Sequence, residues 1–135
     1  MNCPFCNAKD RILKENERAF VILSNPRRVE GHFLVVPKRH VEDPTQITDE
    51  EIVDVFRLVR FVQSRVIGVL GEGTNVRQNY MPFRPDGRIK VSHTHYHVLP
   101  RSNEDRLWQL VDRHDTQTFE DLSHEEHDRI AKLLE

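Results

Sequence analysis

Three histidines occupy alternate positions in the segment VSHTHYHVLPR, residues 91–101. Successive side chains of a strand point to opposite faces, so a strand here would place the imidazoles of His93, His95 and His97 on one face, roughly 7 Å apart. The valine, threonine, tyrosine and leucine of the segment favour a strand, and we expect Pro100 to end it because proline lacks a backbone donor. The pattern therefore predicts a strand that carries a row of histidines.

Such a row could serve three kinds of site. All three imidazoles could bind one catalytic metal ion, since side chains at alternate strand positions can converge. They could be structural, although burying three imidazoles requires three polar partners. In the third interpretation one histidine holds a metal, one is a nucleophile, and one is an acid or hydrogen-bond donor. The choice depends on which other side chains could complete a metal shell.

Both cysteines of the chain, Cys3 and Cys6, lie in the motif NCPFC. In a reducing compartment a Cys-x-x-Cys pair is typical of half a zinc site or of a thioredoxin-like redox pair, rather than of a structural disulfide. The redox motif lies between a strand and a helix, a setting that the start of this chain does not offer. The pair could also be incidental, but with two histidines it would form a closed tetrahedral zinc shell.

Two histidines are the candidates to complete that shell. His40 lies just past a predicted strand end in PKRH, where its side chain can turn back over the N-terminus, and His93 is the first of the row. His32 is a weaker alternative, because a histidine in GHF is more typical of packing at a strand start. Zinc bound by the cysteines, His40 and His93 would leave His95 and His97 free for catalysis.

Four segments have the composition of strands, and they would pair into a mostly antiparallel sheet. They cover residues 19–23, 31–36, 74–81 and the histidine segment. Pro37 is expected to stop the second segment, and the turn sequence RPDG at 84–87 is expected to return the third into the histidine strand.

Thr48 and Glu51 form a capping-box pattern at the start of a predicted helix, and the sequence GEG at 71–73 is expected to end it. Apolar residues share one face of this helix, namely Ile52, Val55, Phe56, Val59, Val62 and Val66. A short helix is expected within residues 103–114, and a final helix from about Ser123 to Leu134.

The order β-β-α-β-β-α predicts an α+β fold in one domain that spans residues 1–135. Residues 1–101 carry the motifs, and residues 102–135 form a helical C-terminal extension. The 37% of hydrophobic residues in a chain of 135 are enough to bury a core without disulfides.

Composition also bounds the partners of the protein. A formal net charge of -2 argues against a protein that coats nucleic acid. No apolar run approaches the roughly 20 residues of a membrane span, and no signal peptide opens the chain. We therefore expect a cytoplasmic protein with no membrane partner and no nucleic-acid partner.

Three motifs resemble one family. The segment HTHYHVLP resembles the His-φ-His-φ-His-φ-φ signature of the histidine triad family, with Thr94 a departure at the first φ position. GHFLVVPKRH is similar to the segment found upstream in that family, and NCPFC to the zinc-binding N-terminus of its bacterial members. The resemblance spans Cys3 to Arg101, and it implies a fold with about five mostly antiparallel strands, a long helix after the second strand pair and a C-terminal helix.

The resemblance also implies roles for single residues. Family members hydrolyse or transfer nucleoside monophosphates, so His95 would attack the α-phosphorus and form a nucleotidyl-histidine intermediate. His97 would hydrogen-bond the phosphate or the leaving-group oxygen. One structural zinc per chain would be held by Cys3, Cys6, His40 and His93.

The same resemblance implies the reaction class. The substrate would be a nucleoside phosphate with a substituted α-phosphate, such as a dinucleoside polyphosphate or a nucleoside phosphoramidate, with an adenine nucleotide expected. Branches with glutamine at the third triad position resemble nucleotidyltransferases and phosphorylases, whereas His97 favours hydrolysis. A phosphorylase or nucleotidyltransferase of the same family, and a non-catalytic nucleotide-binding regulatory module, are the alternatives. Many relatives are dimers, so a homodimer built on the long helix is a further expectation.

The phosphate-binding residues depart from the family pattern. The usual AGQ-x-x-x-H-like run is replaced by QNYMPFRPDGRIKVSH. Asn79 or Gln78 could supply the usual amide. Arg84 and Arg88 could reach a polyphosphate tail or could be solvated turn charges, and Lys90 would contact the phosphates only if the strand bends.

The nucleoside would be bound near the first strand pair. In the family, apolar residues of these strands line the base, and an acid or amide just after them binds the ribose. Phe20, Ile22 and Leu23 fit the first role, with core packing as the alternative, and Asn25 fits the second.

Overall fold

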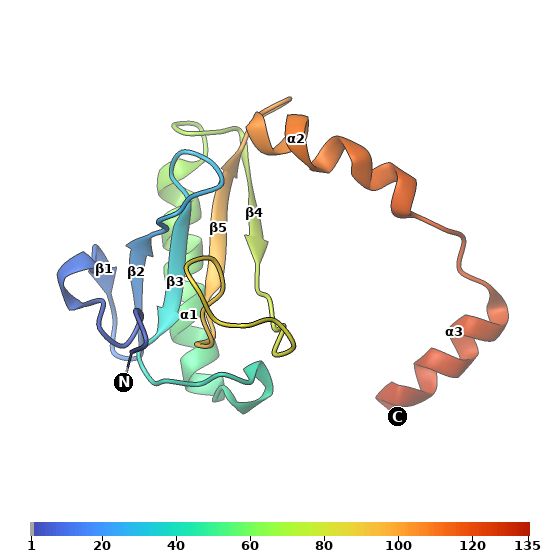
Figure 1. Cartoon of the computed structure of the whole chain (residues 1–135), viewed down its shortest axis with the longest axis horizontal. Coiled ribbons are helices and arrows are strands. Elements are labelled where there is room, and N and C mark those ends of the chain that lie inside the picture. Colours follow the sequence, from blue (N-terminus) through green and yellow to red (C-terminus); the bar gives the residue numbers. More distant parts are fainter. Residues whose placement is uncertain (1) are drawn as a thin grey trace.

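The computed structural model describes residues 2–135 and is built on an antiparallel sheet whose one face is covered by helix α1, Asp49–Val66 (Figure 1). Five strands form the sheet in the order β1-β2-β3-β5-β4. Their bounds are β1 Lys14–Glu15, β2 Ala19–Leu23, β3 Phe33–Pro37, β4 Gly73–Arg77 and β5 Tyr96–Arg101. Every ladder is antiparallel, which confirms the predicted α+β fold.

Strand β2 shows why its run AFVIL is apolar at consecutive positions. Ala19 and Val21 belong to the core cluster that packs against α1, while Phe20 and Ile22 belong to a second cluster with the N-terminal segment. Alternate side chains thus enter different cores because they project from opposite faces of the strand. The sheet is buried on both sides at this point.

Helix α1 begins at the predicted capping box. The Thr48 hydroxyl accepts from the Glu51 backbone N–H at 3.1 Å, and the Glu51 carboxylate accepts from the Thr48 N–H at 2.9 Å. The helix ends at Val66, earlier than the predicted stop at 71–73. The chain leaves the helical conformation at the C-cap Ile67, with a φ of -65° and a ψ of 126°, and Gly68 follows with a φ of +84°, so the glycine pair at 71–73 is not the stop.

The buried face of α1 is narrower than its apolar pattern predicted. Of the six residues expected on it, Val55, Val59, Val62 and Val66 are buried, with Leu58 beside them. Ile52 and Phe56 are 39% and 46% exposed. The first turns of the helix therefore present apolar side chains to solvent.

The predicted limits of three strands were wrong. β3 starts at Phe33 because Gly31, with a φ of +77°, lies in the preceding turn, and Pro37 is the last residue of the strand rather than a stop before it. β4 ends at Arg77 rather than at residue 81. Pro100 lies within β5 opposite Thr74, and β3 pairs with β5 only at residues 96–98, so the missing N–H of Pro100 breaks no ladder.

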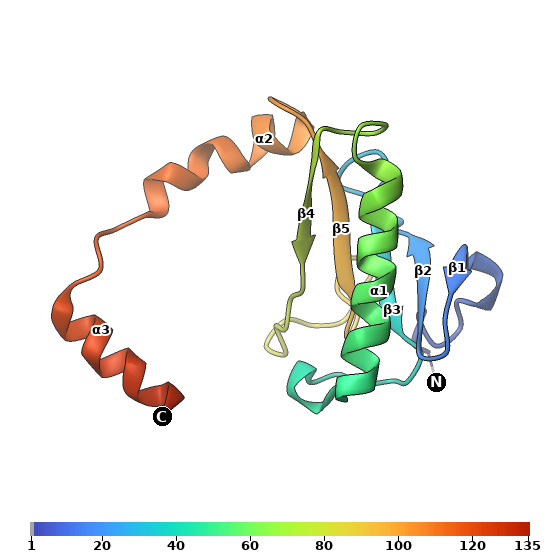
Figure 2. The ribbon, with the colours of Figure 1, turned by 180° about the vertical axis from the view of Figure 1, so that it is seen from behind.

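The C-terminal arm, defined here as residues 102–135, leaves the body at the end of β5 and extends away from it (Figure 1, Figure 2). Ser123 caps its last helix as predicted, since its hydroxyl accepts from the Glu126 N–H at 3.2 Å. The arm contains α2 Arg106–Leu110, the 3-10 helix Asp112–Thr118, α3 His124–Ala131 and the 3-10 helix Lys132–Leu134, and two further 3-10 helices lie at Lys9–Arg11 and Pro44–Gln46. Among the described residues, no helix has the length and apolarity needed to cross a membrane.

Candidate active site and metal centre

The three histidines of the triad do not share one strand. β5 begins at Tyr96, so only His97 lies in it, while His93 and His95 lie in the irregular segment before it. Within that segment the Thr94 N–H donates to the Val41 carbonyl at 2.7 Å instead of joining the β5 ladders. The prediction of one continuous strand with an even row of imidazoles was therefore wrong. The three side chains can instead serve different sites.

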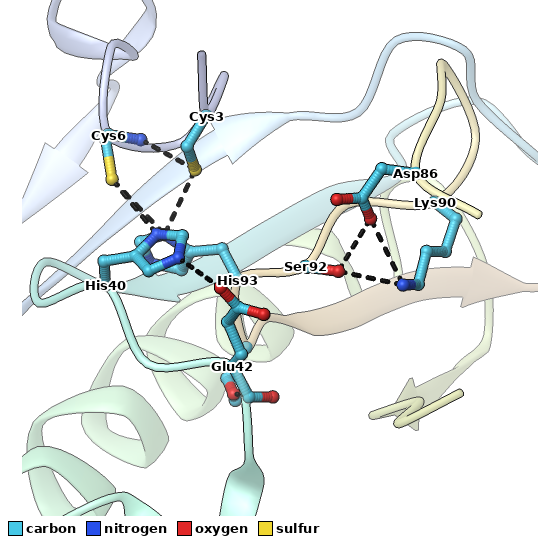
Figure 3. Close-up of polar contacts among 9 residues, drawn as sticks. Cys3, Cys6, His40, Glu42, Asp86, Lys90, Ser92 and His93 are labelled. Atoms are coloured by element: carbon cyan, nitrogen blue, oxygen red, sulfur yellow. Dashed lines mark hydrogen bonds and ion pairs between the residues drawn. The ribbon is translucent and has the colours of Figure 1, made fainter. Parts of the chain in front are cut away.

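His93 turns toward the cysteines and forms a compact cluster with them. Its Nδ1 lies 3.4 Å from the Cys3 Sγ and 3.7 Å from the Cys6 Sγ, and the His40 Nδ1 lies 3.4 Å from the Cys6 Sγ (Figure 3). The four potential ligand atoms of Cys3, Cys6, His40 and His93 all lie within 4.8 Å of one another. The structure thus brings together the four residues predicted for the metal.

Hydrogen bonds at the far nitrogens orient both imidazoles of this cluster. The His93 Nε2–H donates to the Pro37 carbonyl at 2.8 Å, and the His40 Nε2–H donates to the Glu42 carboxylate at 2.9 Å. Each Nδ1 is then left with a lone pair directed at the thiols. Such partners behind the ligands are typical of metal-binding histidines, and two sulfur and two nitrogen donors suit a closed tetrahedral shell.

His95 is held in one tautomer. Its Nδ1 lies 2.7 Å from the His93 carbonyl oxygen, and because that oxygen can only accept, the proton must be on Nδ1. Burial lowers the pKa of His95 below its ordinary value, although the His93 carbonyl acts in the opposite direction. Nε2 therefore carries a lone pair on a neutral ring, which is the form required of a nucleophile.

His32 proves to be part of this site, and the sequence had suggested it only as a weaker zinc ligand. Its Nδ1 accepts from the Arg28 backbone N–H at 3.0 Å, so its Nε2 must carry the proton. That Nε2 lies 2.8 Å from the His97 Nδ1, which therefore accepts. The proton of His97 is then on Nε2, at the side of the ring away from His32.

The neutral state of this pair has a clear physical cause. Burial, followed by the charges of Arg28, His95 and Arg77, lowers the pKa of His32 to about 4. Burial, followed by His95 and His32, lowers the pKa of His97 to about 3. Each ring therefore holds one proton near neutral pH, as the chain of hydrogen bonds requires.

A cavity of about 890 Å³ opens onto the two triad imidazoles that lie outside the metal cluster. Its lining includes His95 and His97, whose ring centroids are 4.9 Å apart. Phe5 also lines it and packs edge-on against His95, with 4.9 Å between the ring centroids. A reacting phosphorus in this cavity would meet both a nitrogen nucleophile and a hydrogen-bond donor.

Only some of the residues predicted for nucleotide binding line the cavity. Asn25, Asn79, Arg88 and Lys90 line the cavity, and so does Arg84. The Lys90 ammonium lies 2.8 Å from the Ser92 hydroxyl and 3.2 Å from the Asp86 carboxylate, which ties it to its own loop (Figure 3).

The remaining predicted residues lie elsewhere. Phe20 and Ile22 are 3% and 0% exposed in the core cluster below the N-terminal segment. Leu23 and Gln78 are outside the cavity lining, and the Gln78 amide donates to the Asn79 carbonyl at 3.0 Å.

Sequence reasoning missed four arginines of the cavity, namely Arg11, Arg27, Arg28 and Arg77. Arg28 comes from the loop after β2, and Arg77 is the last residue of β4. The sequence PRR at 26–28 stands out as a basic cluster, but it does not reveal its distance from the triad.

Comparison with known proteins identifies relatives of the chain. Residues 6–104 match the family model described as HIT domain. The adenosine 5'-monophosphoramidase hnt1 of Schizosaccharomyces pombe is 34% identical over 113 residues, which cover 78% of each chain.

Solved structures share the fold. A HIT family protein from Bacillus anthracis superposes with a TM-score of 0.73 at 24% identity, covering 98% of this chain and 94% of its own. A Zn-bound histidine triad family protein from Mycobacterium smegmatis superposes with a TM-score of 0.65 at 29% identity, covering 79% of this chain and 80% of its own. The likeness confirms the fold that the resemblance implied.

Proposed function

Because the chain belongs to the HIT family, we propose that it is a hydrolase that cleaves a substituted α-phosphate of a nucleoside phosphate. The substrate classes are dinucleoside polyphosphates and nucleoside phosphoramidates, with adenine as the base. The name of the Schizosaccharomyces pombe relative supports an adenine nucleotide. The observation that carries the proposal is the fixed tautomer of His95, whose free Nε2 lies beside the His97 donor in one cavity.

The reaction proceeds in two displacements. In the first, the His95 Nε2 lone pair forms a bond to the α-phosphorus, and the bond to the leaving group breaks with its electron pair. The His97 Nε2–H hydrogen-bonds the departing atom. In the second, water attacks the phosphorus, the P–N bond returns its pair to His95, and the nucleoside monophosphate leaves while the proton of the water passes to solvent.

Rapid quench with a nucleotide labelled at the α-phosphate tests the nucleophile. Wild type should trap acid-labile label on the chain, and His95→Ala should trap none while it still folds and binds nucleotide. His114→Ala, a change at an exposed histidine of the arm, is the matched control and should trap label like wild type. Full turnover in His95→Ala, or label on another residue, would refute the mechanism.

The acceptor distinguishes hydrolysis from its alternatives. A hydrolase forms nucleoside monophosphate at a rate that added inorganic phosphate leaves unchanged. A phosphorylase would instead form nucleoside diphosphate from added phosphate, and a binding module would neither turn over substrate nor trap label.

We also propose that the metal of the four-residue cluster is zinc with a structural role. The support is the donor set of two thiols and two oriented imidazoles, together with the Zn-bound relative from Mycobacterium smegmatis. Four protein ligands would close the shell, so the metal would hold the N-terminal segment against the triad instead of binding substrate.

A homodimer is proposed from the C-terminal arm. Every residue from 113 to 135 is exposed, including several large apolar side chains. These are Phe119, Leu122, Ile130, Leu133 and Leu134. From residue 112 onward the arm has eight acidic residues and three basic ones, while Arg57 and Arg60 flank the exposed Phe56 on α1. Apolar area and opposite charge thus suit the arm of one copy to α1 of another.

Light scattering after size exclusion tests the homodimer. Wild type should show twice the chain mass of 16.0 kDa, and Leu133→Asp combined with Leu134→Asp should lower it. Gln117→Asp, which adds charge at a polar position of the arm, should leave the mass unchanged. A wild-type mass of 16.0 kDa would overturn the dimer.

A further inference from the structure

The cavity that contains His95 and His97 has an unusual charge balance. Seven cationic side chains line it, and no aspartate or glutamate is among the described residues of its lining. The cations come from distant parts of the chain, including the loop after β2, the end of β4 and the loop 82–90. A concave surface lined by one sign of charge concentrates ions of the other sign.

Most of this charge is not neutralised within the protein. Within residues 2–135, none of Arg27, Arg28, Arg84 and Arg88 has a carboxylate at ion-pair distance. Lys90, by contrast, pairs with Asp86, and Arg77 lies 3.8 Å from an Asp112 that also pairs with Arg101. The guanidinium groups of these four arginines are therefore available to an anionic ligand.

The loop 82–90 is held in place beside the cavity. The Gly87 N–H donates to the Lys90 carbonyl at 2.9 Å, and the Ser92 hydroxyl donates to the Asp86 carboxylate at 2.7 Å (Figure 3). These contacts fix the base of the loop that carries Arg84 and Arg88. Arg84 also stacks over the Phe83 ring, 5.5 Å from its centroid.

The hydrogen bonds of His97 restrict the leaving group. His97 accepts at Nδ1 from His32 and offers Nε2–H as a neutral donor. Such a ring can hydrogen-bond a departing oxygen, but giving up its only proton would leave an unfavourable imidazolate. It is thus matched to a leaving group that is stable as an anion.

We propose that Arg28, Arg84 and Arg88 form a subsite for a polyphosphate leaving group, so that preferred substrates carry two or more further phosphates on the α-phosphorus. The inference rests on the hydrolase function proposed above. As the bond from the His95 Nε2 to phosphorus forms, the bridging P–O bond breaks and its electron pair departs with the polyphosphate. The added negative charge develops where the guanidinium groups lie, and bidentate Arg–phosphate contacts would stabilise it.

A phosphoramidate uses these features poorly. Its leaving group is an amine that brings no negative charge to the arginines. The amine nitrogen must also gain a proton as it departs, and neutral His97 does not supply one readily. The subsite therefore predicts selectivity between two substrate classes that share the same α-phosphate chemistry.

The test compares kcat/KM for diadenosine tetraphosphate, adenosine 5'-tetraphosphate and adenosine 5'-phosphoramidate. Wild type should favour both tetraphosphates, and their similar values would show that the phosphates, not a second nucleoside, are recognised. In Arg84→Ala combined with Arg88→Ala, the ratio of tetraphosphate to phosphoramidate kcat/KM should fall roughly 10- to 100-fold. Higher ionic strength should lower the wild-type ratio, because exposed charges are screened.

Lys9→Ala combined with Arg106→Ala removes two exposed cationic side chains outside the cavity lining and is the matched control, which should keep the wild-type ratio. An unchanged ratio in the Arg84 and Arg88 variant, or a wild-type preference for the phosphoramidate, would overturn the subsite. Absence of turnover and of label on His95 with all three substrates would instead overturn the hydrolase function itself.

Discussion

Replacing His32 with leucine should lower kcat about 10- to 100-fold. This is less than the roughly 10²- to 10⁴-fold rate effect of a positioned proton donor or acceptor, because His32 acts only by orienting His97. In wild type the 2.8 Å hydrogen bond from the His32 Nε2–H forces the His97 proton onto Nε2. Without that bond both tautomers of His97 become accessible, and the ring loses its orientation. KM should change little, since His32 contacts His97 and not the substrate in the proposed mechanism.

The same change should cost stability. His32 is 2% exposed, and its replacement leaves the Arg28 N–H and the His97 Nδ1 without their partners. Two lost hydrogen bonds that leave part-buried groups unpaired cost about 2 to 4 kcal/mol in free energy of unfolding. Urea unfolding measures this loss, and turnover of a labelled nucleotide measures kcat.

His32→Gln is the matched control. Its amide offers an acceptor for the Arg28 N–H and a donor for the His97 Nδ1 in the same order, so it should recover much of both kcat and stability. A folded His32→Leu protein with the kcat of wild type would refute the reasoning, as would equal losses in the two variants.

Two further predictions concern the metal and the pH dependence. Metal analysis should find about one zinc per chain, and Cys6→Ser should lose the zinc and lower the melting temperature; a metal-free wild type that does not respond to added zinc would contradict this. Acid should destabilise the fold through His32 and His97: their pKa values of about 4 and about 3 lie below the ordinary 6.5, so the unfolded chain binds more protons. The stability that depends on their neutral state is thus fully present above pH 6.5 and is lost as the pH falls toward 4. The loss is about 2 kcal/mol in free energy of unfolding, because the pair is partly solvated and takes up only one proton. Urea unfolding across this pH range should show that the free energy of unfolding depends less steeply on pH in His32→Gln than in wild type. Equal dependence in the two proteins would contradict the assignment of the acid sensitivity to the His32–His97 pair.

Local sequence patterns correctly predicted those structural features that depend only on neighbouring residues. The capping box of Thr48 and Glu51 predicted the start of α1, and Ser123 predicted the start of α3, because each cap depends on residues three positions apart. The types of Cys3 and Cys6 and the spacing of the histidines indicated a metal site and a separate reactive site. Strand ends were less predictable, since Pro100 is tolerated only because β3 does not extend beside it.

The sequence alone determined which side chains could do chemistry, and the tertiary structure decided which of them meet. His32 and His97 are 65 residues apart and become partners because the β3–β5 register places Leu34 opposite His97. The arginines of the cavity likewise come from loops and a strand end whose approach depends on the sheet order. Such contacts arise from long-range strand pairing, and no period or spacing within the chain encodes them.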